Sequence, residues 1–146
     1  MRLRRVTNDD LADLVTLDRT CFAGCIAYTK GQFRSFLSLK NNIGYLIEKE
    51  ERVIAFILTT WSRDAAEIIT VDVDPAYRRK RLGTKMLHRI ERELKSRGIL
   101  TECLHVSVGN IPAVEFYQNE GFEVLDRIKD YYRDEGDALF MVKPLV

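Results

Sequence analysis

One junction in the chain limits the possible folds more than any other: an apolar strand-like run, then a basic loop, then an amphipathic helix. The run 66–73 is largely β-branched and apolar at both odd and even positions, which predicts a strand buried on both faces. Asp74-Pro75 ends it. Beyond the loop, apolar residues recur at helical spacing, at Leu82, Met86, Leu87, Ile90 and Leu94. A strand covered on both sides predicts a sheet flanked by helices.

Shorter periodic segments complete the expected domain. Helices are predicted after the capping sequence Thr7-Asn8-Asp9-Asp10 and over 30–39, 82–97 and 110–120. Further strands are predicted over 3–6, 43–47, 53–60, 101–106, 122–129 and 138–142. The resulting order is β-α-α-β-β-β-α-β-α-β-β. Because no linker, repeat or low-complexity stretch interrupts it, residues 1–146 are expected to form one domain with a mixed sheet.

Polar residues in two of these helices are expected to face solvent. In the first helix, Leu11, Leu14 and Val15 form the apolar side, and Asp18 or Arg19 the polar side. In helix 82–97, Glu91 and Lys95, like Glu93 and Arg97, have the spacing of i,i+4 ion pairs on the exposed side. Gly98 is expected to end that helix in a left-handed conformation.

Composition excludes several classes of protein. With 46% hydrophobic residues and a formal net charge of +1, the 146-residue chain is neither disordered nor generally basic, so a dedicated nucleic-acid binder is not expected. It lacks an apolar run of about 18 residues and an apolar signal-peptide core, so we expect a cytoplasmic protein without membrane association. Three cysteines, Cys21, Cys25 and Cys103, leave one unpaired in any disulfide scheme, which fits a reducing compartment, and no metal-ligand spacing is present. Cys21 and Cys25 could share a helical face, but we expect them to be small buried hydrophobic side chains.

The loop before the long helix carries the strongest local charge. Arg78-Arg79-Lys80-Arg81 precedes Leu82-Gly83-Thr84, where a helix is expected to begin. A helix N-terminus presents unpaired amides and a partial positive charge, and glycine lets the backbone approach an anion closely. These residues are therefore either a phosphate site or a solvated basic face.

Two motifs in this order resemble the GNAT acyltransferase superfamily. The first is Val71-Asp72-Val73-Asp74-Pro75-Ala76-Tyr77-Arg78-Arg79-Lys80-Arg81-Leu82-Gly83-Thr84, which is similar to the acetyl-CoA signature Gln/Arg-x-x-Gly-x-Gly/Ala, except that Arg81 replaces the first glycine. The second is Asn110-Ile111-Pro112-Ala113-Val114-Glu115-Phe116-Tyr117-Gln118-Asn119-Glu120-Gly121-Phe122, which fits Asn-x-x-Ala-x-x-Phe-Tyr-x-x-x-Gly-Phe. The tail 130–141 further resembles the RimI-like branch, whose members acetylate protein N-termini.

The resemblance implies a fold, an activity and a cofactor site. The fold is α/β (α+β) and three-layered, with a largely antiparallel central sheet of about seven strands and helices on both faces. The activity is direct transfer of acetyl from acetyl-CoA to a primary amine, an N-acetyltransferase reaction of the EC 2.3.1 class. The implied cofactor-binding residues are Val71, Asp72, Val73, Arg78, Arg79, Lys80, Arg81, Leu82, Gly83, Thr84, Asn110 and Tyr117.

The resemblance also implies catalytic residues. Tyr117 would hydrogen-bond or protonate the departing thiolate, unless it is simply a core tyrosine. Glu67 or His105, directly or through water, would remove a proton from the amine. His105 stands where the RimI-like branch carries a glutamate, so a partly buried, non-catalytic histidine is the alternative, and for Glu67 the alternative is a solvated carboxylate.

The acceptor is the least constrained part of this interpretation. Tyr28, Tyr131 and Tyr132 would line a groove for a peptide end, or they are surface aromatics of a hairpin. The favoured acceptor is a protein N-terminal α-amine, with a lysine or a small amine as alternatives. The replacements at Arg81 and His105 leave open a catalytically silent acyl-CoA sensor. The chain is expected to be a monomer or a homodimer.

Overall fold

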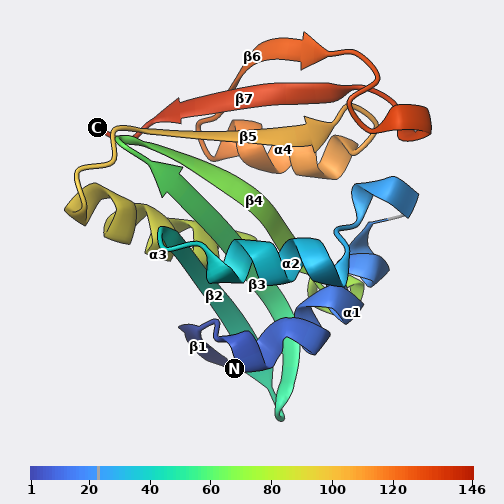
Figure 1. The fold of residues 1–146 in the computed structure, drawn as a ribbon, viewed down its shortest axis with the longest axis vertical. Coiled ribbons are helices and arrows are strands. Elements are labelled where there is room, and N and C mark those ends of the chain that lie inside the picture. Colours follow the sequence, from blue (N-terminus) through green and yellow to red (C-terminus); the bar gives the residue numbers. More distant parts are fainter. Residues whose placement is uncertain (23) are drawn as a thin grey trace.

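A seven-stranded sheet with helices on both faces forms the centre of the molecule (Figure 1). The computed structural model describes residues 1–22 and 24–146, apart from the side chains of Cys25 and Asp134. The strands are β1 (Arg2–Arg5), β2 (Asn42–Lys49), β3 (Arg52–Ser62), β4 (Ala65–Val73), β5 (Thr101–Ser107), β6 (Glu123–Ile128) and β7 (Ala138–Pro144). The helices are α1 (Leu11–Cys21), α2 (Lys30–Ser38), α3 (Leu82–Ser96) and α4 (Ile111–Asn119), with 3₁₀ turns at Asn8–Asp10, Gly24–Ile26, Pro75–Tyr77 and Arg133–Glu135.

The predicted order of elements and the predicted sheet are confirmed. The strands lie in the order β1-β2-β3-β4-β5-β7-β6, and every neighbouring pair is antiparallel except β4 and β5. This one parallel pair is short, because it extends only from Ala65↔Thr101 to Glu67↔Cys103. Beyond these residues the two strands separate, as Figure 1 shows. The sheet is therefore open between the later halves of β4 and β5.

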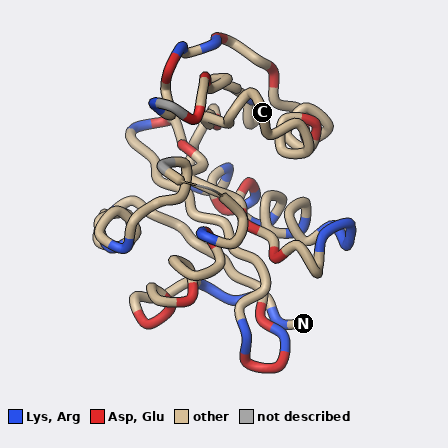
Figure 2. The backbone as a smooth tube through the Cα atoms, turned by 90° about the vertical axis from the view of Figure 1, so that its right-hand side faces the viewer, with Lys and Arg blue, Asp and Glu red and all other residues tan. Residues whose placement is uncertain are grey.

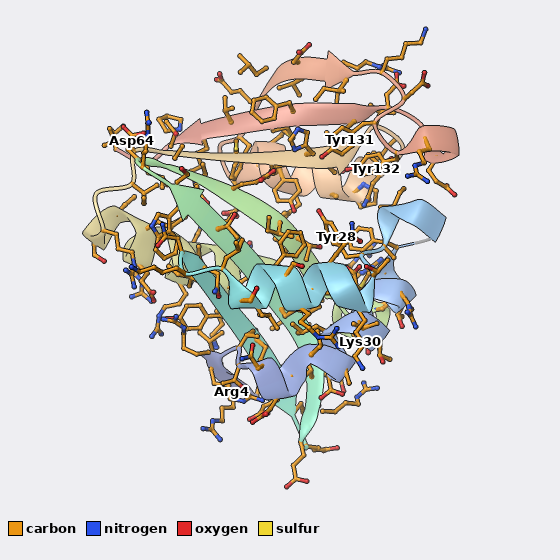
Figure 3. The ribbon with its side chains drawn as sticks, in the orientation of Figure 1. Arg4, Tyr28, Lys30, Asp64, Tyr131 and Tyr132 are labelled. Carbon is orange, nitrogen blue, oxygen red and sulfur yellow. The ribbon has the colours of Figure 1, made fainter. Side chains whose placement is uncertain are left out.

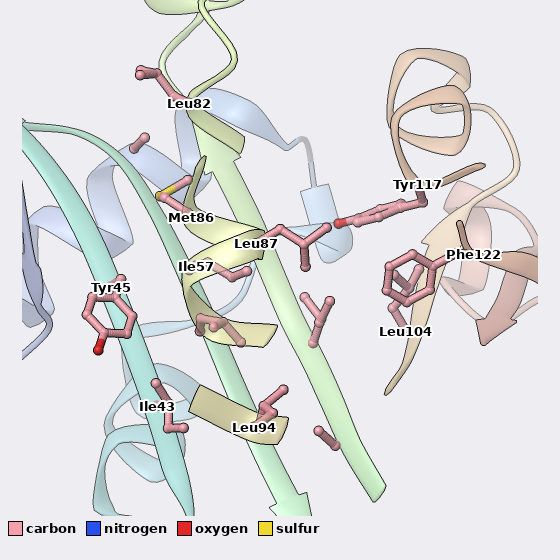
Figure 4. Packing of buried hydrophobic residues seen from close by; sticks show 14 of the residues in the cluster. Ile43, Tyr45, Ile57, Leu82, Met86, Leu87, Leu94, Leu104, Tyr117 and Phe122 are labelled. Atoms are coloured by element: carbon pink, nitrogen blue, oxygen red, sulfur yellow. The ribbon is translucent and has the colours of Figure 1, made fainter. Parts of the chain in front are cut away.

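Two apolar clusters hold the helices to the sheet. On one face, Leu82, Met86, Leu87, Ile90 and Leu94 of α3 are all buried, as predicted, and pack against β2 to β5 and Tyr117 of α4 (Figure 4). On the other face, α1 and α2 cover a smaller cluster around Phe33 and Phe56. The predicted left-handed Gly98 is present, with φ +79, and the amide of Ile99 donates to the Leu94 carbonyl as in a Schellman motif.

The prediction that strand β4 is buried on both faces is confirmed only in part, because each face is fully buried over only half of the strand. Thr59 pairs with Ile68 and Leu58 with Thr70, so Ile69 is an extra residue that forms a β-bulge. The bulge reverses the alternation of side chains, which places Ala66 before it and Val71 after it on the α3 side. Ile69, Val71 and Val73 are only half-buried and line a cavity. The bulge and the cavity together explain apolar residues at both odd and even positions.

Helix α1 begins as predicted but has a different polar side. Thr7 and Asp10 form the expected capping box, in which the Thr7 amide donates to Asp10 Oδ2 at 2.8 Å. Asp18, however, is completely buried and faces β4. Its position follows Leu11, Leu14 and Val15 at i+7, i+4 and i+3, which is the spacing of the buried face.

Glu91 of α3 is also buried, which corrects its predicted pairing with Lys95 in solvent. Lys143 Nζ of β7 donates to Glu91 Oε2 at 2.8 Å, and Glu102 of β5 lies against the same carboxyl group. The predicted Glu93–Arg97 pair is present at 3.7 Å. Neither oxygen of the fully buried Glu102 receives a hydrogen bond from another described residue, so its contact with Glu91 requires a proton on Glu102. Burial, together with Glu91, raises the pKa of Glu102 to about 10.

Cys21 and Cys103 are free and half-buried, and burial raises the pKa of each thiol to about 11. The side chain of Cys25 lies outside the described residues. Across residues 1–22 and 24–146, no helix is long and apolar enough to cross a membrane.

The Glu91–Glu102 contact predicts a specific pH dependence of stability. In the unfolded chain Glu102 loses its proton near pH 4.3, whereas in the folded protein it keeps it up to about pH 10. This group therefore contributes stability that is complete at low pH and is lost as pH rises, by up to about 1.4 kcal/mol per pH unit. We expect Glu102→Gln to unfold at a higher urea concentration than wild type at pH 8, with the difference shrinking toward pH 5. A constant difference across that range would contradict the shared proton.

Candidate active site

A cavity of about 1170 Å³ opens where β4 and β5 separate. It is lined by the inner residues of both strands, by the turn before α3 and by the start of α4. Of the residues singled out in the sequence, those that line it are Tyr28, Val71, Val73, Arg78, Arg79, Arg81, Leu82, Gly83, Thr84, His105, Asn110, Tyr117 and Tyr132. Those that do not line it are Glu67, Asp72, Lys80 and Tyr131. A second cavity of about 590 Å³ shares Arg81, Thr84, Phe116 and Asn119 with it.

The turn before α3 has the geometry of an anion site. Arg81 adopts the left-handed conformation, with φ 59 and ψ 27, so this arginine takes the backbone shape that a glycine would take more easily. The first helical hydrogen bond runs from the Lys85 amide to the Arg81 carbonyl at 3.0 Å. The three amides of residues 82–84 precede that bond and lie at the positive end of the helix. Figure 2 shows the four basic residues 78–81 as an uninterrupted blue segment.

Gly83 has a packing role in this turn that the motif alone does not reveal. A Cβ atom at residue 83 would lie 3.2 Å from Cζ of Phe116, so the start of α3 and the ring on α4 approach each other closely. Asn110 caps α4, since its Oδ1 accepts from the Ala113 amide at 3.3 Å. Lys80 is exposed and stands away from both cavities.

The end of β4 is tied to its surroundings through a single carbonyl. Arg78 Nε donates to the Val73 carbonyl at 3.2 Å, and Cys21 Sγ lies 3.4 Å from the same oxygen. The side chain of Asp72 is 1% exposed and points to the α1 side of the strand, where it accepts from Thr70 Oγ1. Any contact of Asp72 with a molecule in the cavity is therefore made by its backbone.

The two candidate bases form one pair. Glu67 lies opposite Cys103 in the β4–β5 register, so His105, two residues farther along β5, is on the same face of its strand as Cys103. Glu67 Oε2 is 3.3 Å from His105 Nδ1. The imidazole stacks on Tyr131, with ring centroids 4.6 Å apart and planes 7° apart, and Phe140 lies beside it. The pair is thus held in place by aromatic rings from the last hairpin.

Tyr117 lies deep in the cavity wall. It is 7% exposed, and its ring meets Phe122 edge-on at 5.6 Å. Figure 4 shows the ring extending from α4 with its hydroxyl foremost, toward α3. Burial raises the pKa of the Tyr117 hydroxyl above its ordinary value, so it remains a proton donor throughout the neutral range.

Three tyrosines from two distant segments face one another, and two of them, Tyr28 and Tyr132, line the cavity. Tyr28, which precedes α2, points toward Tyr131 and Tyr132 from the opposite side (Figure 3). Its hydroxyl donates to the carbonyl of the bulge residue Ile69 at 3.4 Å. The rings of Tyr131 and Tyr132 meet edge-on at 4.9 Å. Burial raises the pKa of Tyr28 and of Tyr132, so both hydroxyls are neutral donors.

This arrangement can bind a long anionic molecule and an amine together. The helix start and the arginines suit phosphate groups, the separated strand edges suit an extended chain, and the Glu67–His105 pair can accept a proton. Tyr117 supplies a proton donor on the opposite wall. Sequence reasoning missed Asp18, which lines the cavity and accepts from the Tyr28 amide at 2.7 Å.

Comparison with known proteins agrees with this geometry. Residues 10–122 match the acetyltransferase (GNAT) family. The chain is 30% identical over 117 residues to the ribosomal protein bS18-alanine N-acetyltransferase of Salmonella typhimurium, covering 78% of this chain and 75% of that protein. It is 36% identical over 81 residues to N-alpha-acetyltransferase 50 of Danio rerio, covering 53% of this chain and 48% of that protein.

Solved structures extend the match to nearly the whole chain. The crystal structure of the ribosomal-protein-S18-alanine N-acetyltransferase from Escherichia coli aligns with a TM-score of 0.88 at 25% identity, covering 99% of this chain and 93% of that one. The chain therefore belongs to the GNAT family and is an N-acetyltransferase that takes its acetyl group from acetyl-CoA.

Proposed function

We propose that the acceptor is the α-amine of a protein N-terminus. The observation that carries this proposal is the aromatic entrance formed by Tyr28, Tyr131 and Tyr132 beside the Glu67–His105 pair. Tyrosine rings give an extended peptide apolar contact, and their hydroxyls give it hydrogen bonds. The names of the two sequence relatives, an alanine N-acetyltransferase and an N-alpha-acetyltransferase, support the same choice.

Acetyl-CoA supplies an acetyl thioester, and the chain's own residues are proposed to bind it. Residues 79–84 would hold the pyrophosphate with the amides of the helix start, and the arginine side chains would add charge. The backbone of 71–73 would contact the extended arm of the cofactor. The replacements at Arg81 and His105 no longer favour a catalytically silent sensor. Arg81 adopts the left-handed backbone conformation that a glycine would take at this position, and His105 has a carboxylate partner.

Glu67 and His105 are proposed to act as one base. With the Glu67 carboxylate beside Nδ1, the imidazole keeps its proton on that nitrogen and leaves Nε2 as the acceptor. Nε2 can then take the proton of the attacking amine, directly or through water. Tyr117 would donate a hydrogen bond to the sulfur that leaves.

The acceptor is tested with matched peptides. At pH 7.5 about a third of α-amines but only about 0.1% of lysine side chains are neutral and able to attack. We expect lysine-free peptides with a free N-terminus to be acetylated at least roughly tenfold faster than N-terminally blocked peptides with one lysine. Rates are measured by thiol release and the modified atom by mass spectrometry. Faster acetylation of the blocked peptide or of a polyamine would assign the acceptor to another class.

The base is tested by pH profiles. We expect His105→Gln to lower kcat/KM roughly 100-fold and to make the decline in rate on the acid side shallower, so that only protonation of the α-amine itself contributes to it. Glu67→Gln should lower the rate less, because it keeps the imidazole and loses only the group that orients it. If both single variants keep the wild-type profile, the pair is not the base.

Tyr117 is tested by removing one oxygen atom. Tyr117→Phe keeps the ring packing and is expected to lower kcat by roughly tenfold or more, with the KM for acetyl-CoA nearly unchanged. Tyr45→Phe is the matched control, because it removes another buried hydroxyl, which donates to Glu93 Oε1 far from the cavity. Full turnover of the Tyr117→Phe variant would exclude a role for the hydroxyl in the reaction.

A further inference from the structure

Two aspartates meet in the interior between α1 and β4. Asp18 and Asp72 are 0% and 1% exposed. One oxygen of each has a partner: Asp18 Oδ2 accepts from the Tyr28 amide at 2.7 Å, and Asp72 Oδ1 accepts from Thr70 Oγ1. The other two, Asp18 Oδ1 and Asp72 Oδ2, are buried and receive no hydrogen bond from any other residue that the structure describes.

The pair is only compatible with this site if it holds a proton. Ionising two adjacent carboxylates that are both shielded from solvent is strongly unfavourable, because each charge loses hydration and repels the other. One proton converts the two unpaired oxygens into a donor and an acceptor, and the two side chains do lie in hydrogen-bonding contact. Burial first, and then the neighbouring Asp18, raises the pKa of Asp72.

Other charged and titratable groups face the pair from each packed element. They are Cys21 on α1, Tyr28 before α2, Arg78 before α3 and Tyr117 on α4. Burial raises the pKa of the thiol and of both phenols, so these three groups are neutral at pH 7 to 9. The guanidinium of Arg78 is the one positive charge among them, and it balances the single negative charge of the half-protonated pair.

We propose that one proton shared by Asp18 and Asp72 holds the loop of Tyr28 against β4, so that binding of the acceptor depends on that proton. The loop is attached at two points, since the Tyr28 amide donates to Asp18 and the Tyr28 hydroxyl donates to Ile69 of β4. The first attachment is fixed only while Asp18 is itself fixed to Asp72. Both aspartates are positioning residues, and the proposal rests on Tyr28 contacting the acceptor.

The direction of the pH effect follows from the raised pKa values. Because the pKa is raised, the folded pair keeps the shared proton to a higher pH than the unfolded chain does, and the proton leaves as pH rises through the pKa of the folded pair. Its loss puts two charges in the interior, which drives α1 from β4 and releases Tyr28. We therefore expect the KM for a peptide acceptor to rise roughly tenfold as this proton leaves at increasing pH, and the KM for acetyl-CoA to change far less.

The variant Asp72→Asn removes the shared proton and leaves every other titratable group in place, so it isolates the effect of this proton on acceptor binding. The amide of Asn is a permanent donor to Asp18 Oδ1, so we expect the alkaline rise in acceptor KM to disappear in this variant. Asp72→Ala has no donor, and its acceptor KM should be high at every pH. Glu102→Gln is the matched control: it replaces the protonated carboxyl group of the other buried pair with an amide, far from Tyr28, and should keep the wild-type pH dependence.

Hydrogen exchange of the Tyr28 amide gives a readout that needs no activity. Corrected for the intrinsic rate, its protection should fall with rising pH in wild type, stay constant in Asp72→Asn and be low throughout in Asp72→Ala. If Asp72→Asn follows wild type in both protection and acceptor KM, the shared proton does not hold the loop. If none of the peptides is acetylated, the proposed acceptor is wrong, and exchange in wild type and Asp72→Asn still decides the role of the pair.

Discussion

The separation of β4 from β5 after three residue pairs is the constraint on which the rest of the site depends. A continuous parallel pair would have satisfied the backbone groups of both strands and closed the sheet. Because the strands part, the later residues of β4 and of β5 face a cavity instead of each other. An extended molecule that enters the cavity meets strand edges able to bind it as an added strand would be bound. The proposed base pair, Glu67 and His105, stands where the strands begin to part.

Strands β4 and β5 pair over only three residues, so contacts with other elements must hold them in position. Each of the two is fixed to its own helix by a buried carboxyl pair, β4 to α1 through Asp72 and Asp18, and β5 to α3 through Glu102 and Glu91. A hydrogen bond between two carboxyl groups is directional, and breaking one leaves a buried polar group unpaired. Apolar packing alone would let a helix slide along its strand. Each pair thus adds a directional contact between a helix and its strand.

Local patterns in the sequence predicted the elements but not these pairs. The spacing of Leu82, Met86 and Leu94 was enough to place α3 and its buried face, because that face contacts the sheet along its whole length. Glu91 and Asp18 are acidic, so an interpretation by residue type put them in solvent. Each lies instead in the interior against a second acid that is far away in the sequence. Such partners depend on how α1 packs on β4 and how α3 packs on β5, which no local pattern specifies.

The turn before α3 shows how a departure from a motif can keep its geometry. Arg79 and Arg81 both have positive φ, at 66 and 59, which costs roughly 1–2 kcal/mol for each residue that carries a Cβ. Such conformations persist only where the surrounding structure determines them. Here the end of β4 is fixed through the Val73 carbonyl, and the start of α3 is fixed by the close contact of Gly83 with Phe116. Four residues must therefore join two fixed ends, and an arginine at position 81 accepts the strain and adds a positive charge where phosphate is expected.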